Sequence, residues 1–375
     1  MISTSDVVIA GAGIVGAACG EALAREGLRV TLIEPAIAGG GATAAGMGHI
    51  VVMDDSEAQF ALTHYSRDLW EALSPELPAE VEFERSGTLW VASDAEELAA
   101  VGPKQSYYTS RGVKAEPLDQ KGLAAAEPNL RSGLAGGLLV PGDRVIYAPC
   151  AARWLVERTL ARNGSLRFGI SVSGLLSDGV QLSDGSAISA GLTICATGAW
   201  APDLLPGLPV KPRKGHLAIT DRYPGFVRHQ VVELGYLKSA HSHTDESVSF
   251  NVQPRKTGQV LIGSSRQFGQ IGVDVDRRIL GRMLSRAVEF MPGLAALSVM
   301  RCWTGFRAAT DDHLPLIGPY PGRENLYVAT GHEGLGITTS LGTGQMLADM
   351  ILHRTPAIDP APYSPSRFPV EPARA

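Results

Sequence analysis

Residues 1–34 constrain the fold of this chain more than any other segment. Residues 6–10 read as a short buried strand, and they run directly into the turn Gly11-Ala12-Gly13-Ile14-Val15-Gly16. An alanine-rich helix follows over residues 17–26, and a second apolar strand, residues 29–33, ends on Glu34. This order is a βαβ unit with G-x-G-x-x-G at its first turn and an acid closing its second strand. The pattern predicts a Rossmann-like unit that binds a dinucleotide.

Each part of this unit has a physical role. Gly11 permits the tight turn, Gly13 lets a pyrophosphate approach the backbone, and Gly16 lets the helix pack closely on the strand. The helix start holds the pyrophosphate through its N–H groups, and Glu34 accepts hydrogen bonds from the ribose. The alternative is a glycine-rich turn in another kind of α/β protein. The residues that we expect to bind the cofactor here are Gly11, Gly13, Ile14, Val15, Gly16, Glu34 and Pro35.

Composition narrows the class of protein. The 375 residues suffice for about two domains, and 45% hydrophobic with 19% charged residues is typical of a soluble globular protein. A net charge of −5, with no Lys/Arg block, gives no electrostatic case for nucleic acid. The four cysteines stand far apart and read as small buried residues in a reducing compartment.

The apolar N-terminal segment lacks the basic region of a signal peptide, and the first strand and helix account for its apolar residues. No run of eighteen apolar residues is present, so we expect no membrane-spanning helix. These features predict a cytoplasmic protein. Membrane association through a partner stays open.

Small residues fill positions 38–49, directly after Glu34. Such a run is either a flexible linker or backbone that lies close to a ligand. Its position after the ribose-binding acid and its lack of Ser, Pro and charge favour the ligand. The residues that we expect to contact the cofactor here are Gly41, Ala42, Thr43, Ala45, Gly46 and Met47.

The rest of the chain alternates between two kinds of pattern. Helical spacing covers residues 56–73, 93–101, 118–126 and 149–162, and apolar strands are expected at 88–92, 166–172 and 192–196. From residue 206 to about 299, alternating segments such as 216–220, 248–252 and 260–263 indicate antiparallel strands, interrupted by a helix at 276–290. We therefore predict an α/β fold with an α+β second domain. Its Rossmann-like cofactor domain comprises residues 1–48, 143–205 and 303–375, and its antiparallel-sheet substrate domain comprises residues 49–142 and 206–302.

Two later glycine motifs point to a flavin. Ala196-Thr197-Gly198-Ala199-Trp200 ends a buried strand, where a glycine lets the backbone approach a cofactor, although an ordinary turn reads the same way. Residues 326–330 form a strand that leads into Gly331-His332-Glu333-Gly334-Leu335-Gly336-Ile337, which opens a helix to about residue 353. A helix start here stabilises the negative charge around N1 and O2 of a reduced flavin. The predicted contacts are Val172, Ala196, Thr197, Gly198, Trp200, Gly331, His332, Glu333, Gly334, Leu335, Gly336 and Ile337.

Together with Gly305-Phe306-Arg307, Asp311 and Pro315-Leu316-Ile317-Gly318, these motifs resemble, in this order, the D-amino acid oxidase-type family of FAD-dependent oxidoreductases. The family includes glycine oxidase, sarcosine oxidase and D-amino acid dehydrogenases, and the resemblance covers nearly the whole chain. Residues 41–56 are most similar to the β-subunit of bacterial D-hydroxyproline dehydrogenase. That resemblance implies FAD as cofactor, cis-4-hydroxy-D-proline as substrate, and a hetero-oligomer with electron-transfer subunits.

The resemblance also implies a mechanism, in which a hydride moves from the substrate Cα to flavin N5. It places the carboxylate-binding arginine at Arg307, which could instead form a structural ion pair. Arg266 falls where relatives place a side chain close to substrate and flavin, or it is a solvated surface residue. His49 could line the flavin face and meet a substrate hydroxyl, or it packs. His332 is expected to contact the cofactor mostly through its backbone.

Several alternatives stay open from sequence. The nearest are a glycine or sarcosine oxidase that uses O2 and a broad D-amino acid dehydrogenase. Arg307 argues against a subunit devoted to electron transfer, and the second glycine loop argues against a nicotinamide enzyme. His241-Ser242-His243 has the spacing of a metal pair but no evident third ligand, so we predict no metal. Cys302, beside Trp303, is the cysteine to watch, because flavins are sometimes tethered through cysteine.

Overall fold

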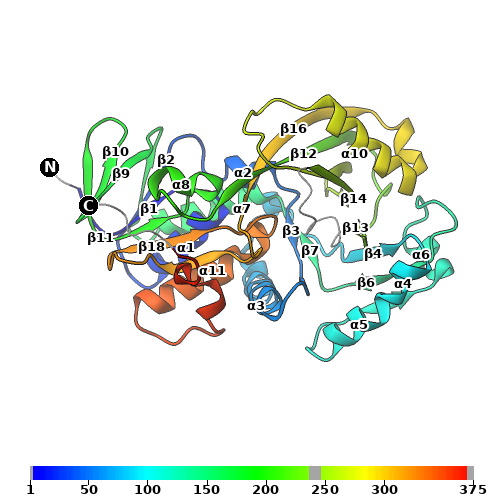
Figure 1. The fold of residues 1–375 in the computed structure, drawn as a ribbon, viewed down its shortest axis with the longest axis horizontal. Coiled ribbons are helices and arrows are strands. Elements are labelled where there is room, and N and C mark those ends of the chain that lie inside the picture. Colours follow the sequence, from blue (N-terminus) through cyan, green and yellow to red (C-terminus); the bar gives the residue numbers. More distant parts are fainter. Residues whose placement is uncertain (1–2, 236–245, 370–375) are drawn as a thin grey trace.

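The computed structural model describes residues 3–235 and 246–369. Within these residues the chain forms two eight-stranded sheets. They lie in two lobes, with both chain ends beside the first sheet (Figure 1). The short strands β3 (His49–Ile50) and β7 (Arg144–Val145) pair with each other between the lobes in this view (Figure 1).

The first sheet has the strand order β17-β18-β11-β1-β2-β8. Its four central pairings, β18–β11, β11–β1, β1–β2 and β2–β8, are parallel, whereas β17 and the hairpin of β9 and β10 are added antiparallel. Strands at the centre of such a sheet are covered on both faces, which explains their nearly continuous apolar sequences. The bounds are β1 Ser3–Ala10, β2 Val30–Glu34, β8 Ser165–Phe168, β9 Val172–Leu176, β10 Gly179–Leu182, β11 Ala187–Cys195, β17 Leu316–Pro319 and β18 Leu326–Thr330.

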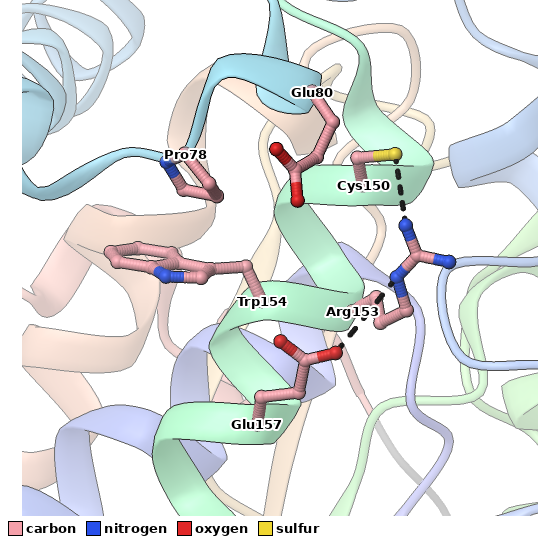
Figure 2. A pocket seen from close by; sticks show the side chains of 6 residues that line it. All are labelled: Pro78, Glu80, Cys150, Arg153, Trp154 and Glu157. Carbon is pink, nitrogen blue, oxygen red and sulfur yellow. Dashed lines mark hydrogen bonds and ion pairs between the residues drawn. The ribbon is translucent and has the colours of Figure 1, made fainter.

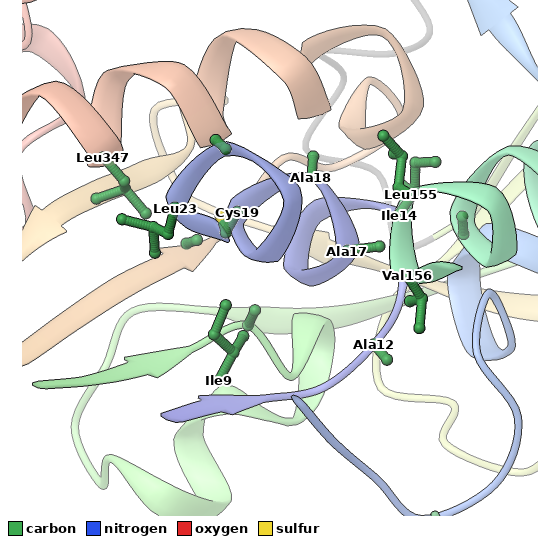
Figure 3. Close-up of a cluster of buried hydrophobic side chains, with 14 of the residues drawn as sticks. Ile9, Ala12, Ile14, Ala17, Ala18, Cys19, Leu23, Leu155, Val156 and Leu347 are labelled. Atoms are coloured by element: carbon green, nitrogen blue, oxygen red, sulfur yellow. The ribbon is translucent and has the colours of Figure 1, made fainter. Parts of the chain in front are cut away.

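Three helices pack together on one face of this sheet: α1 (Ile14–Arg25), α7 (Ala148–Leu160) and α11 (Gly336–Ile351). Ile9 of β1, Leu23 of α1, Leu155 of α7 and Leu347 of α11 are completely buried in their shared core (Figure 3). The backbones of α1 and α11 approach so closely that a Cβ on Gly344 would lie 2.6 Å from the Ala18 carbonyl oxygen. This packing fixes the starts of both helices relative to the sheet. Helix α3 (Glu57–Leu73) covers α11 from outside.

The second sheet has the order β16-β12-β15-β14-β13-β4-β6-β5. Helix α10 (Arg277–Phe290) covers one face, where Phe290 stacks on Phe250 of β14 at 4.5 Å between ring centroids. Because side chains alternate along a strand, the residues beside Phe250 point to the opposite face. The bounds are β4 Thr88–Ala92, β5 Glu116–Leu118, β6 Gly136–Val140, β12 Lys211–Arg222, β13 Gln230–Glu233, β14 Glu246–Pro254, β15 Gln259–Gln267 and β16 Val299–Ala309.

The predicted fold class is confirmed. Two of the expected helices, those at 93–101 and 118–126, begin at the N-caps Asp94 and Asp119. Asp94 accepts a hydrogen bond from Glu97 N at 2.9 Å and Asp119 accepts one from Gly122 N at 2.7 Å. Asp94 caps α4 (Ala95–Ala99) and Asp119 caps α6 (Gln120–Ala126). Three other short helices of the described residues are α2 Gly41–Ala45, α5 Val101–Thr109 and α8 Ala201–Leu204.

Three sequence predictions were wrong in detail. The single strand expected at 166–172 is two strands, because Gly169 has φ +76° and turns the chain between β8 and β9. The helix expected at 93–101 ends at Ala99, and the helix α5 that follows was missed because Gly102-Pro103 looks like a break. Proline is tolerated in this first turn, where no intrahelical donor is required. The second sheet is not wholly antiparallel, since β13 pairs parallel with β4.

Strand β16 also crosses the predicted domain boundary at residue 303. It pairs with β12 from Val299 to Ala309, so it belongs to the second sheet along its whole length. The division of the chain into the two domains by the residue ranges given above stays a prediction.

Candidate active site

The first glycine turn is a tight backbone crossing. Gly11 has φ +100°, and a Cβ there would lie 2.7 Å from the Ala196 carbonyl oxygen. A Cβ on Gly16 would lie 2.1 Å from the Gly11 carbonyl oxygen, which no side chain could tolerate. Gly13 is the N-cap of α1 and gives it no side-chain cap. The start of α1 therefore presents backbone N–H groups beside bare backbone, as a pyrophosphate site requires.

Glu34 is half-buried at the end of β2. Its Oε2 accepts a hydrogen bond from Ala12 N at 2.9 Å, and its Oε1 accepts one from Ala36 N at 3.0 Å. The carboxylate is thereby fixed next to the glycine turn. Gly169 N donates to the Glu34 carbonyl at 2.9 Å, which brings the segment leading to Val172 alongside. Pro35 is exposed. The ribose contact of Glu34 stays a prediction.

The small-residue run forms a short helix, α2, and the loop after it. Thr43 is buried and its Oγ1 accepts a hydrogen bond from Ile14 N at 2.9 Å, which ties α2 to the start of α1. A Cβ on Gly46 would lie 2.9 Å from the Ile337 side chain, so the run lies against the start of α11. Met47 Sδ would be 3.1 Å from a Cβ on Gly263 of β15. The run thus lies between both glycine loops and the second sheet.

The segment after β11 lies next to both glycine loops. Gly198 has φ +59°, and its carbonyl accepts a hydrogen bond from Thr330 Oγ1 at 2.8 Å, next to the second glycine loop. Ala196 contacts Gly11. The Trp200 side chain is 44% exposed and packs edge-on against Phe306, whose ring centroid lies 5.5 Å away. Gly305 and Arg307 of β16 face the small-residue run, and Phe306 between them points to the opposite face. The Trp200 indole, which packs on Phe306, therefore lies on the side of β16 away from the run.

The second glycine loop leads into α11, whose N-cap residue Leu335 provides no side-chain cap. Thr338 Oγ1 donates to the His49 carbonyl at 2.8 Å and accepts from Val51 N at 3.4 Å, which fixes this helix start against the small-residue run. His332 Nε2 lies 3.0 Å from Thr343 Oγ1, inside the helix packing. Burial lowers the pKa of His332 to about 3, so its imidazole is neutral at pH 7. This agrees with a role through its backbone.

Arg307 lies on the face of the second sheet opposite α10. Its Nη1 donates to the Ser265 carbonyl at 3.0 Å. The guanidinium occupies the space where a side chain on Gly215 would lie, because a Cβ there would be 2.3 Å from Nη1. Gly305 makes room in the same way, since its Cβ would be 2.3 Å from Ala45 Cβ in α2. Bare backbone on β12 and β16 therefore lets Arg307 lie flat beside the small-residue run.

Arg266 and His49 lie on this same side. Arg266 is 3% exposed and pairs in register with Ser247, so it is not a solvated surface arginine. Burial lowers the pKa of His49 to about 4, opposed by a contact with Gln253, and the nearby charge of Arg307 lowers it further. The structure thus brings together the three side chains predicted for catalysis. Their roles stay predictions.

Sequence analysis missed the polar face of β14. Asn251 and Gln253 are 3% and 0% exposed, and they face away from α10. Gln253 Nε2 donates to the Met47 carbonyl at 2.7 Å. Asn251 Oδ1 has no hydrogen-bond partner among the described residues, and Gln253 Oε1 and His49 Nε2 have none apart from the contact between His49 and Gln253. Buried polar atoms normally find partners, so these atoms indicate a polar ligand. The alternation Ser-Val-Ser-Phe-Asn-Val-Gln, polar at every second residue of a buried strand, was the available signal.

Two cysteines are excluded from this site. Cys302 pairs with Ala218 and packs into the core beneath α10, so it faces away from Arg307, and the suggestion of a flavin tether there was wrong. Cys150 lines a separate cavity of about 250 Å³ with Pro78, Glu80, Arg153, Trp154 and Glu157 (Figure 2). Burial raises the pKa of the Cys150 thiol, and none of the predicted cofactor residues lines this cavity.

Within residues 3–235 and 246–369 no cluster of three or more candidate metal ligands occurs. His241 and His243 lie outside the described residues, so the expectation about a metal stays a prediction. Among the helices of the described segments, none is long and apolar enough to cross a membrane.

The residues present fit FAD. The starts of α1 and α11, whose own N-cap residues provide no side-chain cap, lie at the two ends of the small-residue run, and glycines keep the backbone bare where a cofactor must approach. The first turn with Glu34 would hold the pyrophosphate and ribose. The start of α11 would hold the flavin pyrimidine edge, and the face bearing Arg307 would cover the flavin ring. Such a fold and site define a flavin-dependent oxidoreductase.

Comparison with known proteins agrees. The family described as "DAO: FAD dependent oxidoreductase" matches residues 6–350, and the chain belongs to this family. It is 30% identical to glycine oxidase of Pseudomonas aeruginosa, over 96% of this chain and 98% of the relative. It is also 30% identical to D-amino acid dehydrogenase of Xanthobacter autotrophicus, over 82% and 73%. The crystal structure of glycine oxidase from Geobacillus kaustophilus superposes with a TM-score of 0.88 at 28% identity, covering 98% and 99% of the two chains. The protein is therefore an FAD-dependent oxidoreductase of this family.

Proposed function

We propose that this protein is a dehydrogenase that oxidises a small D-amino or imino acid, with cis-4-hydroxy-D-proline as its substrate and a pyrroline carboxylate as its product. One observation carries the proposal. Arg307, a carboxylate anchor, lies on the same buried face as two acceptor oxygens: Asn251 Oδ1, which has no partner among the described residues, and Gln253 Oε1, whose side chain contacts His49. A hydroxyproline offers the complementary groups: one carboxylate, one amine N–H and one hydroxyl.

Orientation is the main task of these residues. When bound, FAD supplies N5 as the hydride acceptor. The Arg307 guanidinium forms two parallel hydrogen bonds with a carboxylate and so fixes both position and angle. With the carboxylate held, the acceptor oxygens of Asn251 and Gln253 orient the amine and the ring hydroxyl. The Cα–H is then held in one direction, and this restriction lowers the entropic cost of the reaction.

A protein base is not required. A neutral amine carries a lone pair that assists departure of the hydride from Cα, which leaves a protonated ring imine. This cation gives up its N–H proton to solvent, and the product is the ring imine. His49 stays neutral at pH 7 because its pKa is about 4, so it adds no second positive charge beside Arg307. It also cannot hold a proton that would transfer to the amine. We expect the free amine form of the substrate to react, and hydrolysis of the imine is not needed for turnover.

The dehydrogenase part of the proposal rests on resemblance. Residues 41–56 are similar to the D-hydroxyproline dehydrogenase β-subunit, and D-amino acid dehydrogenase is among the relatives of the chain. We infer that electrons leave the flavin for a partner protein or quinone, and that the chain works in a hetero-oligomer with electron-transfer subunits.

Anaerobic reduction of the purified holoprotein tests both parts of the proposal. The flavin absorbance near ~450 nm is followed with cis-4-hydroxy-D-proline, D-proline, sarcosine, glycine and D-alanine, and air is then admitted. The proposal expects fast bleaching by hydroxy-D-proline and slow recovery in air. D-Proline, which lacks only the hydroxyl, is the matched control for the second polar contact. Equal rates for the two would remove the hydroxyl from the recognition scheme.

A glycine oxidase is the second candidate, because glycine oxidase of P. aeruginosa matches 96% of the chain. This candidate expects bleaching by glycine or sarcosine, with rapid recovery when O2 is admitted. That result would contradict the hydroxyproline dehydrogenase.

A further inference from the structure

Glu333 is the acidic residue of the second glycine loop, and its carboxylate contacts Arg213 and His313. Its Oε1 accepts a hydrogen bond from Arg213 Nη1 at 2.6 Å, and its Oε2 lies 2.9 Å from His313 Nδ1. Its backbone N–H donates to the Ala308 carbonyl at 2.8 Å, one residue beyond Arg307. Glu333 therefore attaches the loop to β12, to β16 and to the segment after β16.

The loop needs such an attachment because of its backbone. Glu333 has φ +47° and His313 has φ +61°, a left-handed conformation that costs free energy for residues other than glycine. Each strained residue is held through the other's side chain. A glycine at 333 would adopt the conformation freely, so a carboxylate at this position indicates that the side chain has a role of its own.

Arg213 is the permanently charged partner of the Glu333 carboxylate. It is 1% exposed and lies directly opposite Arg307 in the register of β12 and β16. Its guanidinium also stacks over the Phe268 ring at 4.6 Å. A buried guanidinium requires a nearby negative charge, and Glu333 provides one. The carboxylate therefore balances a positive charge that lies within one strand of the predicted substrate anchor.

We propose that Glu333 is a positioning residue whose carboxylate, held by Arg213 and His313, fixes how the start of α11 faces the flavin and thereby sets the reduction potential of the bound flavin. This inference rests on the flavin site of the family and not on the identity of the amino acid substrate. It also assigns His313 as the group whose protonation makes the reduction potential of the flavin depend on pH.

The charges around His313 determine its response to pH. Its hydrogen bond to Glu333 raises its pKa above the ordinary 6.5, burial opposes this, the charges of Glu333 and Asp55 raise the pKa, and Arg213 lowers it. Asp54, Asp55 and Asp312 line a cavity of about 320 Å³ together with His313. Asp54 is paired with Lys104, and Asp312 with Arg367. Burial raises the pKa of Glu333, but His313 and Arg213 outweigh it and lower the value to about 2.

The sign of the effect follows from these charges. Glu333 and Arg213 stay ionised above pH 4, so the titrating group is His313. Protonated His313 adds positive charge near the reduced flavin, which carries negative charge, so the reduced form is favoured at low pH. Removing the Glu333 carboxylate takes one negative charge away from Arg213 and also favours the reduced form. This second effect is clearest at pH 9, where His313 carries less positive charge than at pH 5.5.

The test is a measurement of flavin midpoint potentials in the purified holoprotein from pH 5.5 to 9, by photoreduction against a reference dye. No amino acid substrate is added, so the outcome does not depend on the proposed substrate. Glu333→Gln keeps the shape of the side chain and removes its charge. We expect its potential to be more positive than that of the wild type at pH 9. His313→Asn keeps a donor at the Nδ1 position and tolerates the left-handed backbone.

His313→Asn should have a more negative potential than the wild type at pH 5.5, and this difference should shrink as the pH rises to 9. His353→Asn is the matched control, since His353 is also left-handed, with φ +55°, but is exposed at the end of α11. It should match the wild type throughout. Wild-type potentials for both Glu333→Gln at pH 9 and His313→Asn at pH 5.5 would overturn the proposal. If Glu333→Gln does not retain flavin, the pH dependence of the midpoint potential of His313→Asn is enough to support or overturn the proposal.

Discussion

The two glycine loops of this protein do similar work in different ways. In the first loop, Gly11 and Gly16 lie on bare backbone, and a Cβ on Gly16 would clash with the Gly11 carbonyl at 2.1 Å. In the second loop, Glu333 adopts a left-handed conformation that its bonds to Arg213 and His313 stabilise. The first loop depends on the absence of side chains, whereas the second depends on charged side chains.

This difference suits the two ends of FAD. A pyrophosphate keeps its charge throughout turnover, and a fixed cradle of N–H groups satisfies it. The flavin ring gains negative charge when it is reduced, so the potential around it has to be set by charges that the protein can place. The second loop would therefore tolerate substitution of its side chains better than the first, but with altered redox behaviour.

The largest expected effect comes from the first loop. Gly16→Ala should give colourless protein and lower the free energy of unfolding by on the order of 3 kcal/mol, because the methyl group overlaps the Gly11 carbonyl. Flavin absorbance and urea denaturation measure both effects. Gly281→Ala in α10, where a Cβ meets nothing within 4 Å, is the control and should be neutral or slightly stabilising. Full flavin content in Gly16→Ala would contradict the comparison.

Arg307→Lys tests the predicted carboxylate anchor on the face of the second sheet opposite α10. Lysine keeps the charge but cannot form two parallel bonds, so kcat/KM for the amino acid should fall by about 10²-fold while the flavin stays bound. Arg301→Lys on the same strand, at an exposed position stacked on Trp303, should leave kcat/KM unchanged. Unchanged steady-state kinetics in Arg307→Lys would remove the anchor assignment.

A third prediction concerns acid stability of the second loop. The pKa of His332 is lowered by burial from 6.5 to about 3, so between these values the unfolded chain binds a proton that the folded protein does not. Its stabilising contribution is present above pH 6.5 and is lost as pH falls toward 3, at up to about 1.4 kcal/mol per pH unit. His332→Gln should therefore lose less stability than the wild type between pH 6.5 and 4. Identical pH profiles of urea denaturation would show that His332 is not buried neutral.

The smallest effect is expected where the small-residue run joins the first loop. Thr43→Val keeps the shape of the side chain but leaves Ile14 N without its 2.9 Å acceptor. The free energy of unfolding should fall by about 1 kcal/mol. Thr109→Val, at an exposed hydroxyl that bonds only to carbonyls of its own helix, is the control. A change above that of the control shows that the two segments are coupled.

Local pattern was sufficient for the parts of this molecule that depend on backbone. The βαβ unit and the second glycine loop that opens a helix follow from glycine spacing in the sequence.

The parts that could not be predicted depend on contacts between distant segments. The side chain of Glu333 meets Arg213, 120 residues away, and nothing local in Gly-His-Glu-Gly indicates that partner. The place of Asn251 and Gln253 in the site could not be predicted, because it depends on which face of the second sheet α10 covers. Cys302 was considered beside Trp303 in sequence, but neighbours in a strand point to opposite faces, and the structure turns this cysteine into the core.

The most direct test of the account is a crystal structure of the FAD-bound protein with pyrrole-2-carboxylate, a flat ring that imitates the pyrroline carboxylate product. The account predicts that the carboxylate is held by both guanidinium nitrogens of Arg307, with the ring NH toward Asn251 or Gln253. It also predicts that the flavin pyrimidine edge lies at the start of α11. A carboxylate bound away from Arg307, or a flavin ring distant from α11, would contradict it.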